Sequence, residues 1–127
     1  MHHMKIIDPP RELTVEERSF LDRLLMKPFP GRDELQEQVS SVRVSGECTC
    51  GCRSIVLTVN KSLSQKALVT RRIPIEAEGI DIDGITIHFL LHVVDGFLSE
   101  LEIFREDSKS IQRLPDYNSL ELLCLDD

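Results

Sequence analysis

Three cysteines occupy alternate positions in the segment GECTCGCRS, at Cys48, Cys50 and Cys52. Zinc takes four thiolate or imidazole ligands in a tetrahedron, so this segment can supply three of them. Its two glycines let the backbone fold around an ion, and the fourth ligand would come from Cys124, a histidine or solvent, with Cys124 as the candidate residue. The paired C-x-x-C spacing, a stronger zinc signal, is missing. Two interpretations therefore stay open: a zinc-stabilised structural domain, and a loop of ordinary thiols with no cofactor.

A catalytic role for these thiols has little support in the sequence. A nucleophilic cysteine needs a nearby base or cation that lowers its pKa, and Arg53 is the only charged neighbour within the segment's second half. The chain also lacks a Gly-rich phosphate loop, a nucleophile elbow and a dinucleotide fingerprint. We predict no catalytic residue and favour a protein that is not an enzyme.

Two histidines and two glutamates near residue 95 raise the question of a second site. His88 and His92 would share one face of a helix, but on a strand they lie roughly 13 Å apart, too far for one ion. Glu100 and Glu102 lie about 6–7 Å apart along a strand, a separation found in glycoside hydrolases. However, the chain has no Trp and one Tyr, and so lacks an aromatic platform for a sugar. We therefore expect these side chains on a solvated sheet face.

The N-terminal third of the chain predicts two helices. Thr14 and Glu17 have the spacing of a capping box, which satisfies free amides at a helix start. An apolar stripe at helical spacing follows, and the segment KPFPG ends this first helix. A second, shorter helix is expected over about 32–40.

Beyond residue 41 the apolar residues alternate, which indicates strands. We expect strands at 42–44, 55–59, 73–77, on both sides of residue 95, and at 120–125. The segments 42–44 and 55–59 are out of phase, so the cysteines lie in the connection between them. Pro74 lacks a backbone N–H, which suggests that its strand is an edge of the sheet. The fold class is thus α+β: two N-terminal helices packed on an antiparallel sheet of about five strands, in a single domain over 1–127.

The segment 85–105 predicts a hairpin that turns at Asp95-Gly96. A two-residue turn would place carboxylates opposite core residues, whereas a three-residue loop gives one almost wholly apolar face. We therefore favour the three-residue loop, which pairs Val93 with Phe97, Leu91 with Ser99, Phe89 with Leu101 and Ile87 with Ile103. His88 then lies opposite Glu102. The other face of the hairpin, called the outer face below, carries His88, Leu90, His92, Leu98, Glu100, Glu102 and Phe104.

The composition limits the partners of the chain. Its 127 residues include 22 acidic and 15 basic ones, for a net charge of −7. Phosphate binding needs clustered Lys and Arg, so a nucleic-acid partner is not expected. No apolar run is long enough for a signal peptide or a membrane span, so the expected location is the cytoplasm, where thiols stay reduced. Residues 1–10, which include His2 and His3, are expected to be disordered or derived from an expression vector.

The segments GECTCGCRSI and HVVDGFLSELEIFRED, with the LPD that follows, resemble a group of small uncharacterised bacterial proteins. Those proteins share a C-x-C-G-C loop and an L-S-E-L-E-[IV]-[FY]-R-E-D hairpin. The resemblance implies a bacterial origin and a common fold, with no known activity. The leading interpretation is a protein-binding domain, comparable to an immunity protein or an adaptor, that binds a protein partner or a second copy through the outer face. The alternative is the zinc-stabilised domain.

Overall fold

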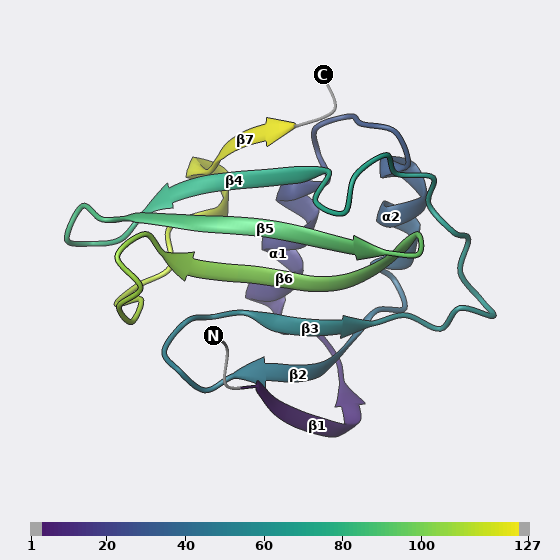
Figure 1. The fold of residues 1–127 in the computed structure, drawn as a ribbon, viewed down its shortest axis with the longest axis horizontal. Helices are drawn as coiled ribbons and strands as arrows, with labels where there is room; N and C mark the ends of the chain where they lie inside the picture. Colours follow the sequence, from purple (N-terminus) through teal and green to yellow (C-terminus); the bar gives the residue numbers. More distant parts are fainter. Residues whose placement is uncertain (1–3, 125–127) are drawn as a thin grey trace.

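The computed structural model describes residues 4–124, which form a seven-stranded antiparallel sheet with two helices on one face (Figure 1). The helices are α1 (Val15–Leu24) and α2 (Arg32–Gln38), and a 3-10 turn, η1, spans Tyr117–Ser119. The sheet order is β1-β2-β3-β6-β5-β4-β7. Its strands are β1 (Met4–Arg11), β2 (Arg43–Cys48), β3 (Ile55–Thr58), β4 (Ile75–Ile80), β5 (Thr86–Val94), β6 (Phe97–Arg105) and β7 (Glu121–Cys124). Neither described helix is long and apolar enough to cross a bilayer.

The α+β class is confirmed, but the expected number of about five strands is wrong. The strand that sequence analysis missed is β1, which lies where disorder was expected and pairs with β2. This strand carries two prolines and little alternation of apolar and polar residues, which hides it from pattern analysis. Prolines are tolerated there because β1 is an edge strand. Residues 1–3, with His2 and His3, and Leu125 of the last expected strand lie outside the described residues.

The prediction that Pro74 marks a sheet edge is also wrong. Strand β4 begins at Ile75, one residue after the proline, and it lies between β5 and β7. Because Pro74 precedes the ladder, its missing N–H costs no hydrogen bond within the sheet. The edge on this side of the sheet is β7.

Helix α1 begins as the sequence predicts. The Thr14 hydroxyl accepts a hydrogen bond from the Glu17 amide (3.1 Å), and the Glu17 carboxylate accepts one from the Thr14 amide (2.8 Å). The buried stripe of α1 then packs on the sheet, where the rings of Phe20 and Phe89 stack with centroids 5.0 Å apart. These contacts place the apolar core between the helices and one face of the sheet, and leave the other face without a helix.

The hairpin register differs from the predicted one. Val94 pairs with Phe97 across a two-residue turn, in which Asp95 (φ 54°) and Gly96 (φ 86°) are both left-handed. A β-bulge at Ser99 then shifts the pairing, so that Leu91 faces Leu101 and Phe89 faces Ile103. The bulge adds one residue, which reconciles the tight Asp-Gly turn with an apolar inner face.

The two-residue turn places Leu98 opposite Val93 on the core side of the sheet, where Leu98 is 2% exposed. Gln38, the last residue of α2, is buried behind this end of the hairpin. Its side-chain amide donates to the carbonyls of Gln65 and Gly96 (2.9 Å each) and accepts from the Leu98 amide (2.9 Å). One side chain therefore ties α2 to the hairpin turn and to the loop before β4.

Candidate metal centre

The cysteine loop connects β2 and β3 and is held both at its neck and at its tip. At the neck of the loop, the Cys48 amide donates to the Ser54 carbonyl (3.0 Å). The buried Ser54 hydroxyl accepts from the Ile103 amide (2.8 Å) and donates to the Ile103 carbonyl (3.2 Å). Ser54 thus fastens the end of the loop to β6 and prolongs the short pairing of β3 with that strand.

The tip of the loop is held by the segment that follows β6. Gly51 has φ 96°, a left-handed conformation that favours glycine, and its carbonyl accepts from the Ile111 amide (3.2 Å). A Cβ at this position would also overlap the Ser110 side chain. The glycine is therefore needed for both the backbone turn and the close approach of the two segments.

A buried ionic network sets the position of the segment 106–113. Arg105 is 3% exposed and donates to Asp107 (2.7 and 3.0 Å), to Asp81 (3.1 Å) and to Asp83 (2.9 Å). Asp81 also accepts from the backbone amides of Gln112 (2.8 Å) and Arg113 (3.0 Å). Arg105 thereby joins the β4–β5 turn, the end of β6 and the segment 106–113, which lies against the cysteine loop.

The charges and hydrogen bonds of this network shift the pKa values of Asp107, Asp81 and Arg105. Hydrogen bonds from Arg105 lower the pKa of Asp107 to about 2. Burial alone would raise the pKa of Asp81, but hydrogen bonds from backbone amides and from Arg105 outweigh burial and lower it. Hydrogen bonds to the same carboxylates raise the pKa of Arg105. Asp81, Asp107 and Arg105 are therefore ionised over the whole neutral range.

The loop brings its three thiols together. The sulfurs of Cys48, Cys50 and Cys52 all lie within 4.8 Å of one another, and those of Cys50 and Cys52 are 3.4 Å apart. Four sulfurs arranged tetrahedrally around zinc at about 2.3 Å lie about 3.8 Å from each other. The observed separations fit three corners of such a tetrahedron after small rotations of the side chains. The three residues predicted as neighbouring ligands thus form one cluster.

The environment of the cluster disfavours a reactive thiol. Burial, followed by hydrogen bonding with Cys48, raises the pKa of Cys52 to about 12. A nucleophilic cysteine needs the opposite shift. Cys50 is exposed and Cys48 is half-buried, so the cluster lies at the surface with one of its sulfurs facing solvent.

Cys124 is not part of this cluster, which corrects its assignment as the fourth ligand. It lies on β7, five strand positions from β2, or about 24 Å across the sheet. There its thiol is buried and lies 3.9 Å from the Pro28 carbonyl. Its apolar surroundings are those of an ordinary core cysteine.

The outer face brings His92, Glu100 and Glu102 together, with ligand atoms within 4.8 Å of one another. His92 Nε2 lies 2.8 Å from Glu102, and Arg72 Nε donates to His92 Nδ1 (3.2 Å). Because Nδ1 accepts, the ring proton sits on Nε2 and points at Glu102. A metal at Nε2 would need that proton removed and a proton on Nδ1, where Arg72 already donates. The arrangement is that of a hydrogen-bonded chain, not of a metal ligand set.

The expected pair of His88 and Glu102 does not form. His88 lies opposite Phe104 and stacks on its ring (5.2 Å between centroids), with Glu106 3.3 Å away. The prediction assumed a register two residues away from the observed one. Of the seven residues predicted on the outer face, six do lie there and Leu98 lies in the core.

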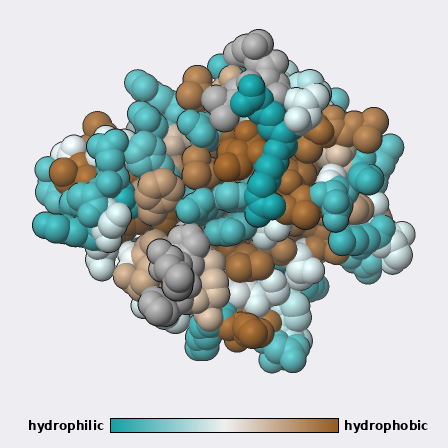
Figure 2. Space-filling view, viewed as in Figure 1, coloured by the Kyte–Doolittle hydropathy of each residue, from teal (hydrophilic) through white to brown (hydrophobic). Residues whose placement is uncertain are grey.

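The outer face is open but not uniformly apolar. Its apolar surface lies in pieces between hydrophilic side chains (Figure 2). Leu90 and Phe104 are half-buried there, and the His88 ring stacks on Phe104. No described helix covers this face.

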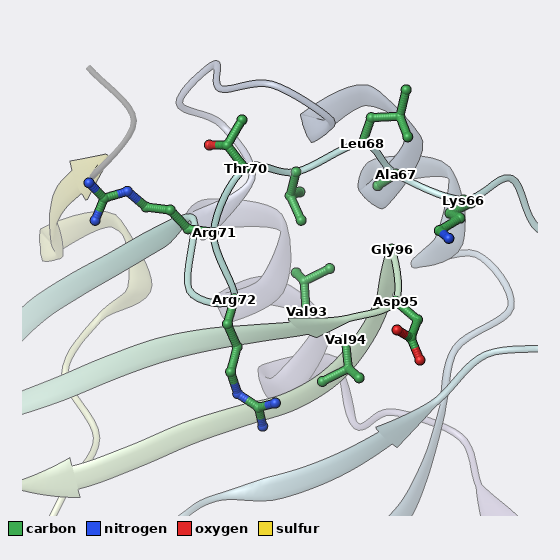
Figure 3. Close-up of a pocket in the computed structure, with 11 residues that line it drawn as sticks. Lys66, Ala67, Leu68, Thr70, Arg71, Arg72, Val93, Val94, Asp95 and Gly96 are labelled. Atoms are coloured by element: carbon green, nitrogen blue, oxygen red, sulfur yellow. The ribbon is translucent and has the colours of Figure 1, made fainter.

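A cavity of about 460 Å³ lies between residues 66–72 and the turn of the hairpin, and sequence analysis missed it. Figure 3 shows Val93 and Val94 on its floor, with Arg71 and Arg72 extending away from it in different directions. The adjacent arginines were the only sequence signal, and their guanidinium groups do not converge on one ligand position. We therefore assign it no ligand.

Residues 10–115 match the family model of a domain of unknown function, DUF6984, and the chain belongs to this family. No curated protein and no solved structure matches it. The expectation of an uncharacterised family is confirmed, whereas its proposed motifs and bacterial origin stay predictions. The matched part contains the cysteine loop, both hairpin strands and the Arg105 network, and excludes β7.

Proposed function

We propose that this protein binds one zinc ion through Cys48, Cys50 and Cys52. The observation that supports the proposal is the mutual distance of the three sulfurs, within 4.8 Å. Thiolates are soft ligands that select zinc and copper(I) over magnesium or calcium. A loop anchored at Ser54 and Gly51 presents these sulfurs without a large rearrangement of the backbone.

A bound ion would join the end of β2 to the start of β3. It would replace thiol protons with a positive charge, so binding releases protons and weakens in acid. It would also stabilise the folded chain by mass action, by about 2.7 kcal/mol at a free zinc concentration 100 times the Kd. Since the domain has its own apolar core, we expect it to stay folded without the ion.

Native mass spectrometry tests the proposal on protein reduced with a phosphine and supplied with zinc. We expect one zinc per chain for the wild type and for Cys124→Ser, and no retained zinc for Cys50→Ser. Cys124→Ser is the matched control because it removes a thiol outside the cluster. A wild type without zinc, or zinc retained equally by Cys50→Ser, would contradict the site.

A second candidate function is protein binding through the outer face. It is supported by the absence of any described helix over this face, where Leu90 and Phe104 lie among glutamates. Such a surface favours a basic partner with an apolar centre. We expect a partner captured by the wild type to be retained by Leu63→Asp, an exposed position in the loop after β3, and lost by Leu90→Asp. Capture that is equal for both variants would reject the face.

A further inference from the structure

The cysteine cluster offers three ligands where zinc takes four. Among residues 4–124, the group that contains the cluster has three members, and no histidine or carboxylate lies close enough to all of them to join it. Closed structural zinc sites have four protein ligands, whereas sites with three keep the fourth position open. Residues 4–124 would therefore leave one coordination position of an ion bound here without a protein ligand.

The cysteine cluster borders a small cavity between the cysteine loop and the end of β6. The cavity has a volume of about 230 Å³ and is lined by Cys50, Cys52, Glu102, Phe104, Arg105, Ser108 and Lys109. This volume is below the roughly 300–1,000 Å³ of pockets for drug-sized ligands. It suits a ligand of a few heavy atoms next to the two sulfurs.

The charges around the cavity indicate the class of that ligand. Arg105 is engaged by three aspartates, and Glu102 is hydrogen-bonded to His92. Lys109 lines the same cavity as Cys50 and Cys52 and adds a positive charge there, which also acts on Asp107. A zinc ion with three thiolates carries one net negative charge, and a fourth thiolate gives the charge of the common Cys₄ sites, which proteins tolerate.

We infer that the fourth position takes the thiolate of a small free thiol, which enters through this cavity and is favoured by the Lys109 ammonium. This inference rests on the proposed metal site. The zinc–sulfur bond forms as the thiol gives its proton to solvent and displaces a water from the metal, so no oxidant or reductant is needed. A closed zinc site would only stabilise the fold, whereas this site would also bind a small thiol.

Cobalt(II) in place of zinc makes the coordination visible. The full chain, reduced with a phosphine, is loaded with one cobalt(II) and titrated with 2-mercaptoethanol. We expect the sulfur-to-cobalt charge-transfer absorption to rise saturably by about one third, as three cobalt–sulfur bonds become four. Half-saturation should need several-fold more thiol in Lys109→Gln and be unchanged in Lys61→Gln, an exposed lysine beyond the other end of β3.

Two results would overturn the inference while leaving the metal site intact. One is a cobalt spectrum that does not change with thiol, and the other is loss of cobalt to the added thiol. Glu102→Gln tests whether this carboxylate fills the position instead: its spectrum before thiol should match the wild type, and a different one would make Glu102 the ligand. Failure to bind cobalt at all would reject the proposed metal site, and the inference with it.

Discussion

Replacing Gln38 by glutamate is the most discriminating test of how α2 is tied to the hairpin. The change keeps the shape of the side chain and the oxygen that accepts from the Leu98 amide. It replaces the amide nitrogen, which donates to Gln65 and Gly96, with a second oxygen. In the ionised form this oxygen would face two carbonyl oxygens in a site that is 1% exposed.

The magnitude follows from burial and hydrogen bonding. The protonated acid can still donate to one carbonyl, so in Gln38→Glu at pH 4 the loss is about one hydrogen bond, or about 1 kcal/mol. Burial beside acceptors raises the pKa of the new carboxyl in the folded state. A raised folded-state pKa means that stability falls as pH rises above the unfolded-state pKa, by about 1.4 kcal/mol per pH unit. At pH 7 the total loss can therefore reach about 5 kcal/mol.

Urea unfolding of Gln38→Glu and the wild type at pH 4, 5.5 and 7 measures how the difference in their free energies of unfolding changes with pH. Gln36→Glu is the control, because it adds the same charge on the same helix at an exposed position. Its single hydrogen bond, to the Leu25 carbonyl (3.0 Å), is lost only when the carboxyl ionises, so at this exposed position the loss should not exceed about 1 kcal/mol at any pH. If the loss in Gln38→Glu were equally small and independent of pH, the buried three-bond arrangement would be refuted.

Two further predictions concern the ionic network and the hairpin register. The pKa of Asp107, lowered to about 2 by Arg105, means that its contribution to stability is present above the unfolded-state pKa and is lost as pH falls towards 2. In acid-unfolding measurements, Asp107→Asn should be less stable than the wild type at pH 6 and lose less stability between pH 4 and 2; parallel curves would contradict this. For the register, Leu98→Ala should cost about 2–4 kcal/mol and Leu90→Ala about 1 kcal/mol in urea unfolding. Equal losses would place both leucines on the same side of the sheet.

Local signals in the sequence are sufficient for much of the fold. The capping box at Thr14 and Glu17 sets the start of α1, because its hydrogen bonds join residues three apart. The phase change between the two apolar runs correctly puts the cysteine tip in the connection between β2 and β3. The distance between alternate cysteines is likewise local, so the three thiols form a cluster as the spacing indicates.

These local patterns do not predict the register or the order in which distant strands pair. The hairpin pattern set a two-residue Asp-Gly turn against an apolar inner face, and the choice of a three-residue loop was wrong because the pattern could not show that a bulge at Ser99 satisfies both. The tight turn places Leu98 opposite Val93 in the core, and the bulge then brings Leu101 and Ile103 onto the same side of the sheet. Strand order is equally invisible, so the separation of Cys124 from the cluster had no signal.

The chain by itself thus determines the helices, the described strand segments other than β1, and the three-thiol loop, because each depends on neighbours a few residues apart. The folded molecule decides which segments meet: it places β1 beside β2, brings Asp81 to Arg105 and sets the segment 106–113 against Gly51. These contacts arise from packing and charge pairing between distant residues. They make the cysteine loop a surface cluster that borders a cavity, with no fourth ligand among residues 4–124.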